Sequence, residues 1–261
     1  MKKRSMLWPL ALATAPAALV AWGVYHPAAQ IFGPTVRRTS RPGTIALTFD
    51  DGPNPRTTPR LLDLLDRFEA RATFFVLGMR VRAYRAIVRD ILARGHAIGN
   101  HTDTHPRLIW HGVATIEAEL RGCQDAVADA TGHRPRLHRP PFGYRHPQLA
   151  GAAVRAGLPG IVMWTVMTRD WTEDCSVIDT RCARVRDRDI VVMHDGDYRD
   201  PAANRDVTLG ALAEWLPRWR DCGWQSVALD VQPGAQNASQ TPASDTASES
   251  STTDRASSAR R

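Results

Sequence analysis

Two adjacent carboxylates, Asp50 and Asp51, stand at the end of an apolar run and are followed by Gly52-Pro53. Residues 44–49 alternate large apolar side chains with small or polar ones, which is the period of a β-strand. Gly-Pro then ends the strand and turns the chain. Acids at the carboxyl end of a strand are typical of active sites in parallel α/β folds, although Asp-Gly is also ordinary turn chemistry. The pair therefore indicates catalysis only if it has partners elsewhere in the chain.

His101 and His105 lie four residues apart in the stretch H-T-D-T-H, directly after an expected short strand at 96–99. Histidines at this spacing can face the same way on a helical turn, or bind one ion from a loop at a strand's end. Such a pair also occurs on surface helices. With one of the two carboxylates it makes three protein ligands and an open position, which is the composition of a catalytic divalent-metal site. A water or a substrate oxygen would fill the open position.

Three more polar stretches fall at or near expected strand ends: R-P-P-F-G at 139–143, R-D-W at 169–171 and V-M-H-D at 192–195. In this order with T-F-D-D-G-P and H-T-D-T-H, they resemble the motifs of the polysaccharide deacetylase family, also called carbohydrate esterase family 4. That family includes deacetylases of chitin, peptidoglycan and nodulation factors. The resemblance covers residues 42–231, and its first two motifs are specific in combination.

The resemblance implies a metal site and a base beside it. Asp51, His101 and His105 match the ligands of a divalent metal, for which zinc is the expected ion. Asp50 matches the general base that takes a proton from the attacking water, and Arg139 matches the residue that orients and charge-balances this base. The chemistry suits an amide, because a divalent ion polarises the carbonyl and lowers the pKa of water.

The resemblance also implies the remaining roles of a deacetylation site. The backbone N–H of Phe142 would help to hold the oxyanion, and His194 would protonate the leaving amine as general acid. Trp171 and Val192 would wall the pocket for the acetyl methyl group. An acid separate from the base is needed, because the amine leaves only when it is protonated.

Two positions depart from the family pattern. Phe142 stands where the third motif commonly has Tyr, which matters little because the role belongs to the backbone. Met167 replaces the first acid of the fourth motif, D-x-x-D-W, which in the family helps to tune the catalytic histidine. Without that carboxylate we expect a lower pKa for His194, and we expect Met167→Asp to move the alkaline limb of the pH–rate profile upward. This expectation assumes that Asp170 does not already supply the charge.

The function that these residues indicate is metal-dependent hydrolysis of N-acetyl groups from N-acetylglucosamine-containing glycan of the cell wall, either chitooligosaccharide or peptidoglycan, with release of acetate. The alternatives are hydrolysis of another amide or of an O-acetyl ester, and a non-catalytic glycan-binding envelope protein on the same scaffold. The formal net charge of +7 does not predict a nucleic-acid partner, because the arginines are scattered among acids without a basic run. The oligomeric state is not indicated.

The chain should divide into four parts: a signal or membrane anchor at 1–25, a linker at 26–41, the catalytic domain at 42–231 and a disordered tail at 232–261. Basic residues at 2–4 precede an apolar stretch at 6–25, which is long enough to span a bilayer but contains prolines. We therefore expect a domain anchored in the inner membrane and facing the periplasm, or a secreted one. The tail lacks aromatic and bulky aliphatic residues and should not fold.

Within the domain, expected strands and helices alternate, which predicts an α/β fold with a parallel sheet, either open or rolled into a barrel. The resemblance implies a distorted, incomplete (β/α) barrel with the site in a groove at its top. The four cysteines of an exported chain predict disulfides with three possible pairings, of which Cys175–Cys182 is the easiest local one. The expected strands are 44–49, 72–77, 96–99, 160–166, 190–194 and 226–229, and the expected helices are 57–70, 84–94, 115–130, 150–156 and 209–220.

Overall fold

The computed structural model describes residues 8–230. All of them belong to the first of two compact units, Met1–Val231 and Gln232–Arg261. The tail at 232–261 that the sequence predicts to be disordered lies outside the described residues, as does the basic start of the chain.

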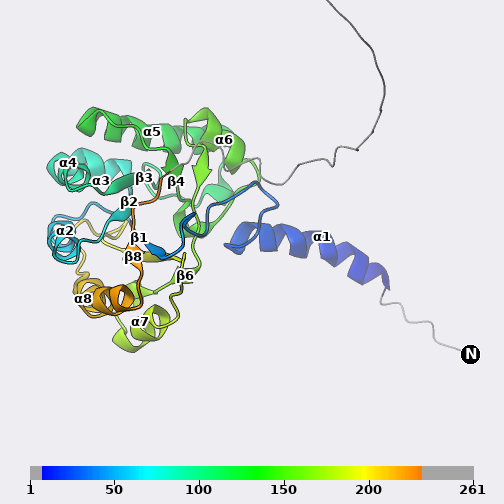
Figure 1. The fold of residues 1–261 in the computed structure, drawn as a ribbon. Helices are drawn as coiled ribbons and strands as arrows, with labels where there is room; N and C mark the ends of the chain where they lie inside the picture. The colour runs from blue at the N-terminus through cyan, green and yellow to red at the C-terminus, as the bar shows by residue number, and fades with distance from the viewer. Residues whose placement is uncertain (1–7, 231–261) are drawn as a thin grey trace, which may run out of the picture. The chain divides into compact units, whose positions relative to one another are not determined.

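A parallel sheet of eight strands forms the centre of the first unit, in the order β5-β4-β3-β2-β1-β7-β6, with β8 paired to β1 (Figure 1). The central strand β1 is buried along its whole length, as its apolar sequence predicts. The sheet curls into an incomplete barrel with helices outside it, so the predicted fold class is confirmed. The strands are β1 (Thr44–Asp50), β2 (Ala72–Val76), β3 (Ala97–Asn100), β4 (Leu137–His138), β5 (Gly160–Ile161), β6 (Val166–Met167), β7 (Ile190–His194) and β8 (Gln225–Ser226).

Helices follow most strands and cover the outside of the sheet. Helix α2 turns Leu61, Leu62 and Leu65 toward the core, at the helical spacing seen in the sequence. Two short helices, α3 and α7, were not expected. The helices are α1 (Trp8–Tyr25), α2 (Thr58–Arg67), α3 (Gly78–Ala83), α4 (Arg85–Ala93), α5 (Val113–Thr131), α6 (Leu149–Arg155), α7 (Cys175–Cys182) and α8 (Asp206–Asp221), with 3-10 turns at Leu108–Trp110, Pro141–Gly143 and Asp170–Thr172.

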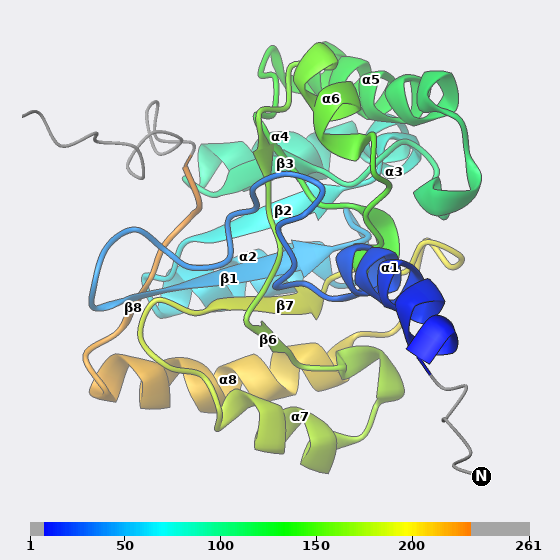
Figure 2. The same cartoon turned by 90° about the vertical axis from the view of Figure 1, so that its right-hand side faces the viewer.

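The alternation of side chains along β1 aims the catalytic region into the barrel. Ile45, Leu47 and Phe49 pack outward in the main hydrophobic core under the helices. Ala46 packs inward, in a second core. Asp50 has the same parity as Ala46 and therefore points into the barrel. In Figure 2 the arrowheads of β1, β2 and β7 point to the same side, so the residues that end these strands gather there.

The segment that the sequence assigns to a linker, 26–41, runs along a seam between the end of β5 and the residues that precede β7. Val36 bridges Val162 in parallel, and Arg38 bridges Asp189 in the antiparallel sense. The backbone N–H of Val36 donates to the carbonyl of Ile161 at 2.8 Å. These contacts satisfy backbone groups that an open sheet edge would leave unpaired.

No helix among residues 8–230 is long and apolar enough to cross a membrane. The membrane anchor therefore stays a prediction, and part of its segment lies outside the described residues. The C-terminal end of α1 lies against the barrel (Figure 1). There Tyr25 meets the ring of Tyr144 edge to face.

The predicted disulfides are not formed in the structure, in which all four cysteines are free thiols. Cys175 and Cys182 lie at opposite ends of α7. Seven residues of helix separate their Cα atoms by about 10 Å, which is beyond the span of a disulfide. Cys123 is fully buried in the main core.

Candidate active site

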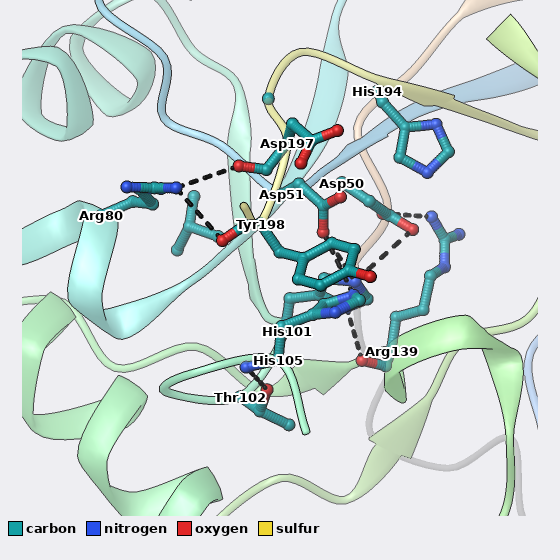
Figure 3. A network of polar contacts seen from close by, with 12 residues as sticks. Asp50, Asp51, Arg80, His101, Thr102, His105, Arg139, His194, Asp197 and Tyr198 are labelled. Atoms are coloured by element: carbon teal, nitrogen blue, oxygen red, sulfur yellow. Dashed lines mark hydrogen bonds and ion pairs between the residues drawn. The ribbon is translucent and has the colours of Figure 1, made fainter. Parts of the chain in front are cut away.

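The two acids at the end of β1 point to different partners. Asp50 accepts a hydrogen bond from Nη1 of Arg139 at 2.8 Å. Asp51 leaves the strand with a left-handed backbone, φ 71°, and its Oδ1 lies 3.2 Å from Nε2 of His105 and 3.5 Å from Nε2 of His101 (Figure 3). The turn aims the two carboxylates at different nearest partners, Arg139 and His105, while Oδ2 of Asp50 also lies 4.0 Å from Nε2 of His101.

The two histidines are held in a loop after β3 that is shaped by its own polar groups. The Nδ1 atom of His101 hydrogen-bonds to the carbonyl oxygen of Arg139 at 2.8 Å, so this nitrogen carries the proton. The Nε2 lone pair of His101 is therefore free on the side of Asp51. Thr102 and His105 both have left-handed backbones, and the Thr102 hydroxyl accepts from the N–H of His105 at 3.1 Å.

The donor atoms of Asp51, His101 and His105 fit a divalent metal. One ligand atom from each lies within 4.8 Å of the others, and all three residues are buried. Burial lowers the pKa of His105 to about 2 and that of His101 well below its usual value, so both rings are neutral ligands. Burial raises the pKa of Asp51 to about 7, and its Oδ1 lacks a hydrogen-bond donor. A buried oxygen without a donor beside two imidazole lone pairs is the electrostatic setting that a cation stabilises.

Arg139 lies inside the barrel and is fully buried. Its Nη1 donates to the hydroxyl of Thr48 and to Asp50, both at 2.8 Å. The guanidinium also lies 4.2 Å above the ring of Phe75. Burial lowers the pKa of Arg139 from its usual value, but the Asp50 carboxylate opposes this, and the two charges compensate each other inside the barrel.

Asp170 supplies the carboxylate beside His194, which corrects the expectation built on Met167. The Nδ1 atom of His194 lies 2.8 Å from Oδ1 of Asp170, and the His194 backbone N–H donates to Oδ2 at 2.7 Å. The hydroxyl of Thr208 donates to the same carboxylate at 2.8 Å. Burial alone would lower the pKa of His194, but Asp170 outweighs it and raises that pKa to about 9. The predicted low pKa is therefore wrong.

Similarity to known proteins agrees with this geometry. A sequence profile of the polysaccharide deacetylase family matches residues 37–161. A chitooligosaccharide deacetylase of Sinorhizobium fredii is 35% identical over 201 residues, covering 72% of this chain and 93% of the relative. This chain belongs to the polysaccharide deacetylase family.

Other deacetylases resemble the chain at a similar level. The peptidoglycan-N-acetylglucosamine deacetylase PgdA of Listeria monocytogenes is 37% identical over 199 residues, which are 76% of this chain and 40% of that protein. The structure of a family 4 carbohydrate esterase from Streptomyces lividans in complex with acetate has a TM-score of 0.63 and 32% identity, covering 70% of this chain and 91% of that one. The relatives are hydrolases, so the predicted enzyme class is confirmed.

The three remaining predicted site residues lie near His105 and His194. Phe142 has a left-handed backbone, φ 59°, and its ring lies 4.6 Å from that of His105. Trp171 stands edge-on to His194 at 5.2 Å and is 43% exposed. Val192 is buried, one inward position before His194 on β7. The roles implied for these three residues stay predictions.

Met167 sits on β6 opposite Val192 and packs with the inner core instead of facing an ion pair. The first position of the fourth motif is therefore apolar in this deacetylase, while the Asp of the D-W pair faces His194. The sequence contains Asp170, but it does not show whether position 167 or position 170 lies beside His194.

Sequence reasoning missed two residues in the loop after β7. The ring of Tyr198 stacks on His105 with the centroids 4.3 Å apart and the planes at 23° (Figure 3). Asp195 is fully buried and accepts from the hydroxyl of Thr58, and burial raises its pKa to about 7. Asp195 stood in the fifth motif without an assigned role, and Tyr198 carried no motif signal at all.

Proposed function

We propose that this chain removes N-acetyl groups from N-acetylglucosamine-containing glycan and releases acetate. In this proposal Asp51, His101 and His105 hold a divalent metal ion, for which zinc is the expected one. The observation that supports this best is the pairing of charges around the three ligands. Asp50 is bound to Arg139 on one side, and His194 is bound to Asp170 on the other. A base and an acid thus flank one candidate metal site.

When bound, the divalent ion would polarise the acetyl carbonyl and lower the pKa of water. Asp50 would take the proton of the attacking water, because Arg139 holds its carboxylate in place inside the barrel. His194 would give its proton to the leaving nitrogen, which its raised pKa allows at neutral pH. The N–H of Phe142 would donate to the developing oxyanion.

The glycan is proposed from the relatives. Two of those named above are a chitooligosaccharide deacetylase and a peptidoglycan-N-acetylglucosamine deacetylase. The acetylated amino sugar is common to both names, so it is the group that this site should accept. The alternative of a non-catalytic role rested on Met167 in place of a carboxylate, and it loses that support because Asp170 supplies the carboxylate beside His194.

Acetate release tests the proposal. Purified protein is stripped of metal, reloaded with zinc and supplied with chitooligosaccharides, peptidoglycan and acetylxylan. We expect acetate from the amino-sugar glycans only after reloading. The His101→Ala variant should bind no metal and should release no acetate. Acetate from acetylxylan alone would favour the O-acetyl ester alternative, and stoichiometric zinc binding that survives loss of both histidines would rule out this metal site.

We also propose that the domain lies outside the cytoplasm, attached to the inner membrane or exported by the segment at 1–25. The support is the order of basic and apolar residues in that segment. Protease digestion of intact spheroplasts should degrade the domain while a cytoplasmic marker survives. Degradation only after lysis would contradict this location.

A further inference from the structure

The two candidate histidine ligands are held in different ways. The Nδ1 atom of His101 has a hydrogen bond to the carbonyl oxygen of Arg139 at 2.8 Å, and such a bond fixes the orientation of a ligand ring. The Nδ1 atom of His105 is buried and has no hydrogen-bond partner among residues 8–230. Tyr198 stacks on this ring, but no hydrogen bond to Nδ1 fixes its direction. The direction of the His105 ring therefore depends on the backbone that carries it.

That backbone is the tight loop between the two histidines, residues 102–104. Thr102 and His105 both have left-handed backbones, with φ 74° and φ 65°. The N–H of Thr102 donates to the side-chain oxygen of Asn100 at 2.9 Å, and the Thr102 hydroxyl accepts from the N–H of His105 (Figure 3). Left-handed conformations at residues other than glycine cost free energy and persist only where their surroundings hold them. The loop therefore needs support from neighbouring elements.

Helix α3 supports the carbonyl groups of this loop. The backbone N–H groups of Gly78 and Met79 donate to the carbonyl oxygens of Thr102 and Asp103, both at 3.1 Å. Gly78 and Met79 begin α3, and the first N–H groups of a helix have no partner within it. The same hydrogen bonds thus satisfy the start of α3 and hold one side of the loop.

One carboxylate on α5 supports the donor groups of the loop. Oε2 of Glu119 accepts from the backbone N–H groups of Asp103 at 3.0 Å and Thr104 at 2.8 Å, and Oε1 accepts from the Thr104 hydroxyl at 2.8 Å. Gly122 lies three residues further along the same face of α5, where a Cβ would approach Cγ of Asp103 to 3.0 Å. Hydrogen bonds to an ionised carboxylate are about twice as strong as neutral ones. Glu119 thus joins the loop to a long helix.

We propose that Glu119 is a positioning residue of the metal site: by holding the loop between the histidines, it directs Nε2 of His105 toward Asp51. These two side chains approach to 3.2 Å between Nε2 and Oδ1. The inference rests on the proposed function, in which both residues bind a divalent ion. Ligands that are already in place bind an ion at a lower cost in ordering. A bound ion also holds the ligands itself, so the loss of Glu119 should weaken metal binding more than it slows the loaded enzyme.

The test measures the Kd for zinc by competition with a chromophoric chelator. We expect Glu119→Ala to raise this Kd about 10–100-fold, while saturating zinc restores most of kcat. Glu119→Gln keeps one acceptor oxygen but loses the charge, so its Kd should rise less. Glu117→Ala is the matched control, because Glu117 lies on the same helix but pairs with Arg121 and Arg155 instead of the loop. It should leave the Kd for zinc unchanged.

A second variant tests whether the effect passes through the loop. Thr104→Val removes one of the three hydrogen bonds to Glu119 and should raise the Kd for zinc to a smaller extent. Combined with Glu119→Ala, it should add little, because the bond is already lost.

Circular dichroism of the metal-free proteins confirms that folded chains are compared. If Glu119→Ala does not fold without metal, Glu119→Gln and Thr104→Val carry the comparison. A Kd for zinc that is unchanged in the folded variants, or that rises equally in Glu117→Ala, overturns the role of Glu119. A wild-type protein that binds no stoichiometric zinc would instead overturn the metal site of the proposed function.

Discussion

The buried charges of the active site come as pairs, and the pairing assigns their roles. Arg139 neutralises Asp50, and Asp170 neutralises protonated His194. Asp51 is the exception, because no arginine or lysine contacts its buried carboxylate among the described residues. An uncompensated buried carboxylate is costly, so its natural partner is the metal ion.

The pair of Asp170 and His194 predicts a pH effect. The general acid must be protonated, so activity falls as pH rises through the pKa of His194, which is about 9. Asp170→Asn removes the charge that raises this pKa and leaves burial, which lowers it. The alkaline limb of the kcat profile should then move down by about one pH unit or more. Thr208→Val is the control, since it removes one hydrogen bond but keeps the carboxylate.

The same pair reverses the expectation for Met167→Asp. Because the carboxylate beside His194 is already present, this substitution should leave the alkaline limb in place. It should also destabilise the protein, because it puts an acid against the inner apolar core that Met167 now contacts. An alkaline limb that moves upward in Met167→Asp would show that Asp170 does not control the histidine.

The two adjacent acids should be separable by substitution. Asp50→Asn should retain zinc but lose about 10²–10⁴-fold in kcat, because it removes the base and leaves the ligands. Asp51→Asn should lose zinc, because it removes the only carboxylate among the candidate ligands. Metal content and acetate release measured on the same preparations check both results. Loss of zinc in Asp50→Asn would mean that the roles are reversed.

At the scale of elements, the seam segment should contribute to stability. Val36→Pro removes the N–H that donates to Ile161 and leaves a carbonyl on β5 without its donor. The free energy of unfolding should fall by about 1–3 kcal/mol, measured by urea denaturation. Val36→Ala keeps the N–H and should change stability little, because the side chain is largely exposed. Equal stability of the two variants would contradict a role for this backbone contact.

The elements show which parts of the fold the sequence can predict. Strand β1 and helix α2 can be predicted from the spacing of their apolar residues. Helix α2 buries one face, and β1 is buried along its whole length. The seam contact of Val36 has no such signal, because that residue is exposed and pairs only through its backbone. Short α3 and α7 likewise lack enough turns to show a period.

The active site also contains residues that the sequence predicts and residues that it does not. The candidate ligands could be predicted because divalent metals bind to histidine and carboxylate side chains, and these stand directly after strands in the sequence, while the choice of Asp51 over Asp50 followed from the family resemblance. The position of Asp170 beside His194 depends on the path of the 3-10 turn Asp170–Thr172, which residue types do not specify. Tyr198 was missed because stacking on His105 depends only on where a loop returns.

For the whole molecule, the metal should stabilise the fold as well as the reaction. An ion that binds only the folded chain stabilises it by about 4 kcal/mol at a thousandfold excess over Kd. Zinc should therefore raise the Tm of the wild-type protein and not that of His101→Ala. The gain should shrink as pH falls below about 7, because a proton then competes for Asp51. A gain in Tm that is equal in both proteins would indicate zinc bound elsewhere.

Strand β1 pairs with β2, β7 and β8, and its last residue is one of the two acids. Its amides should therefore be among the slowest in the molecule to exchange with deuterium, because they open only when the whole sheet opens. Phe142 and Tyr198 lie on the loops after β4 and β7, and the sequences of these loops can change without disturbing β1. Selection or design can thus vary which glycan is held while the position of the reacting acids is inherited unchanged.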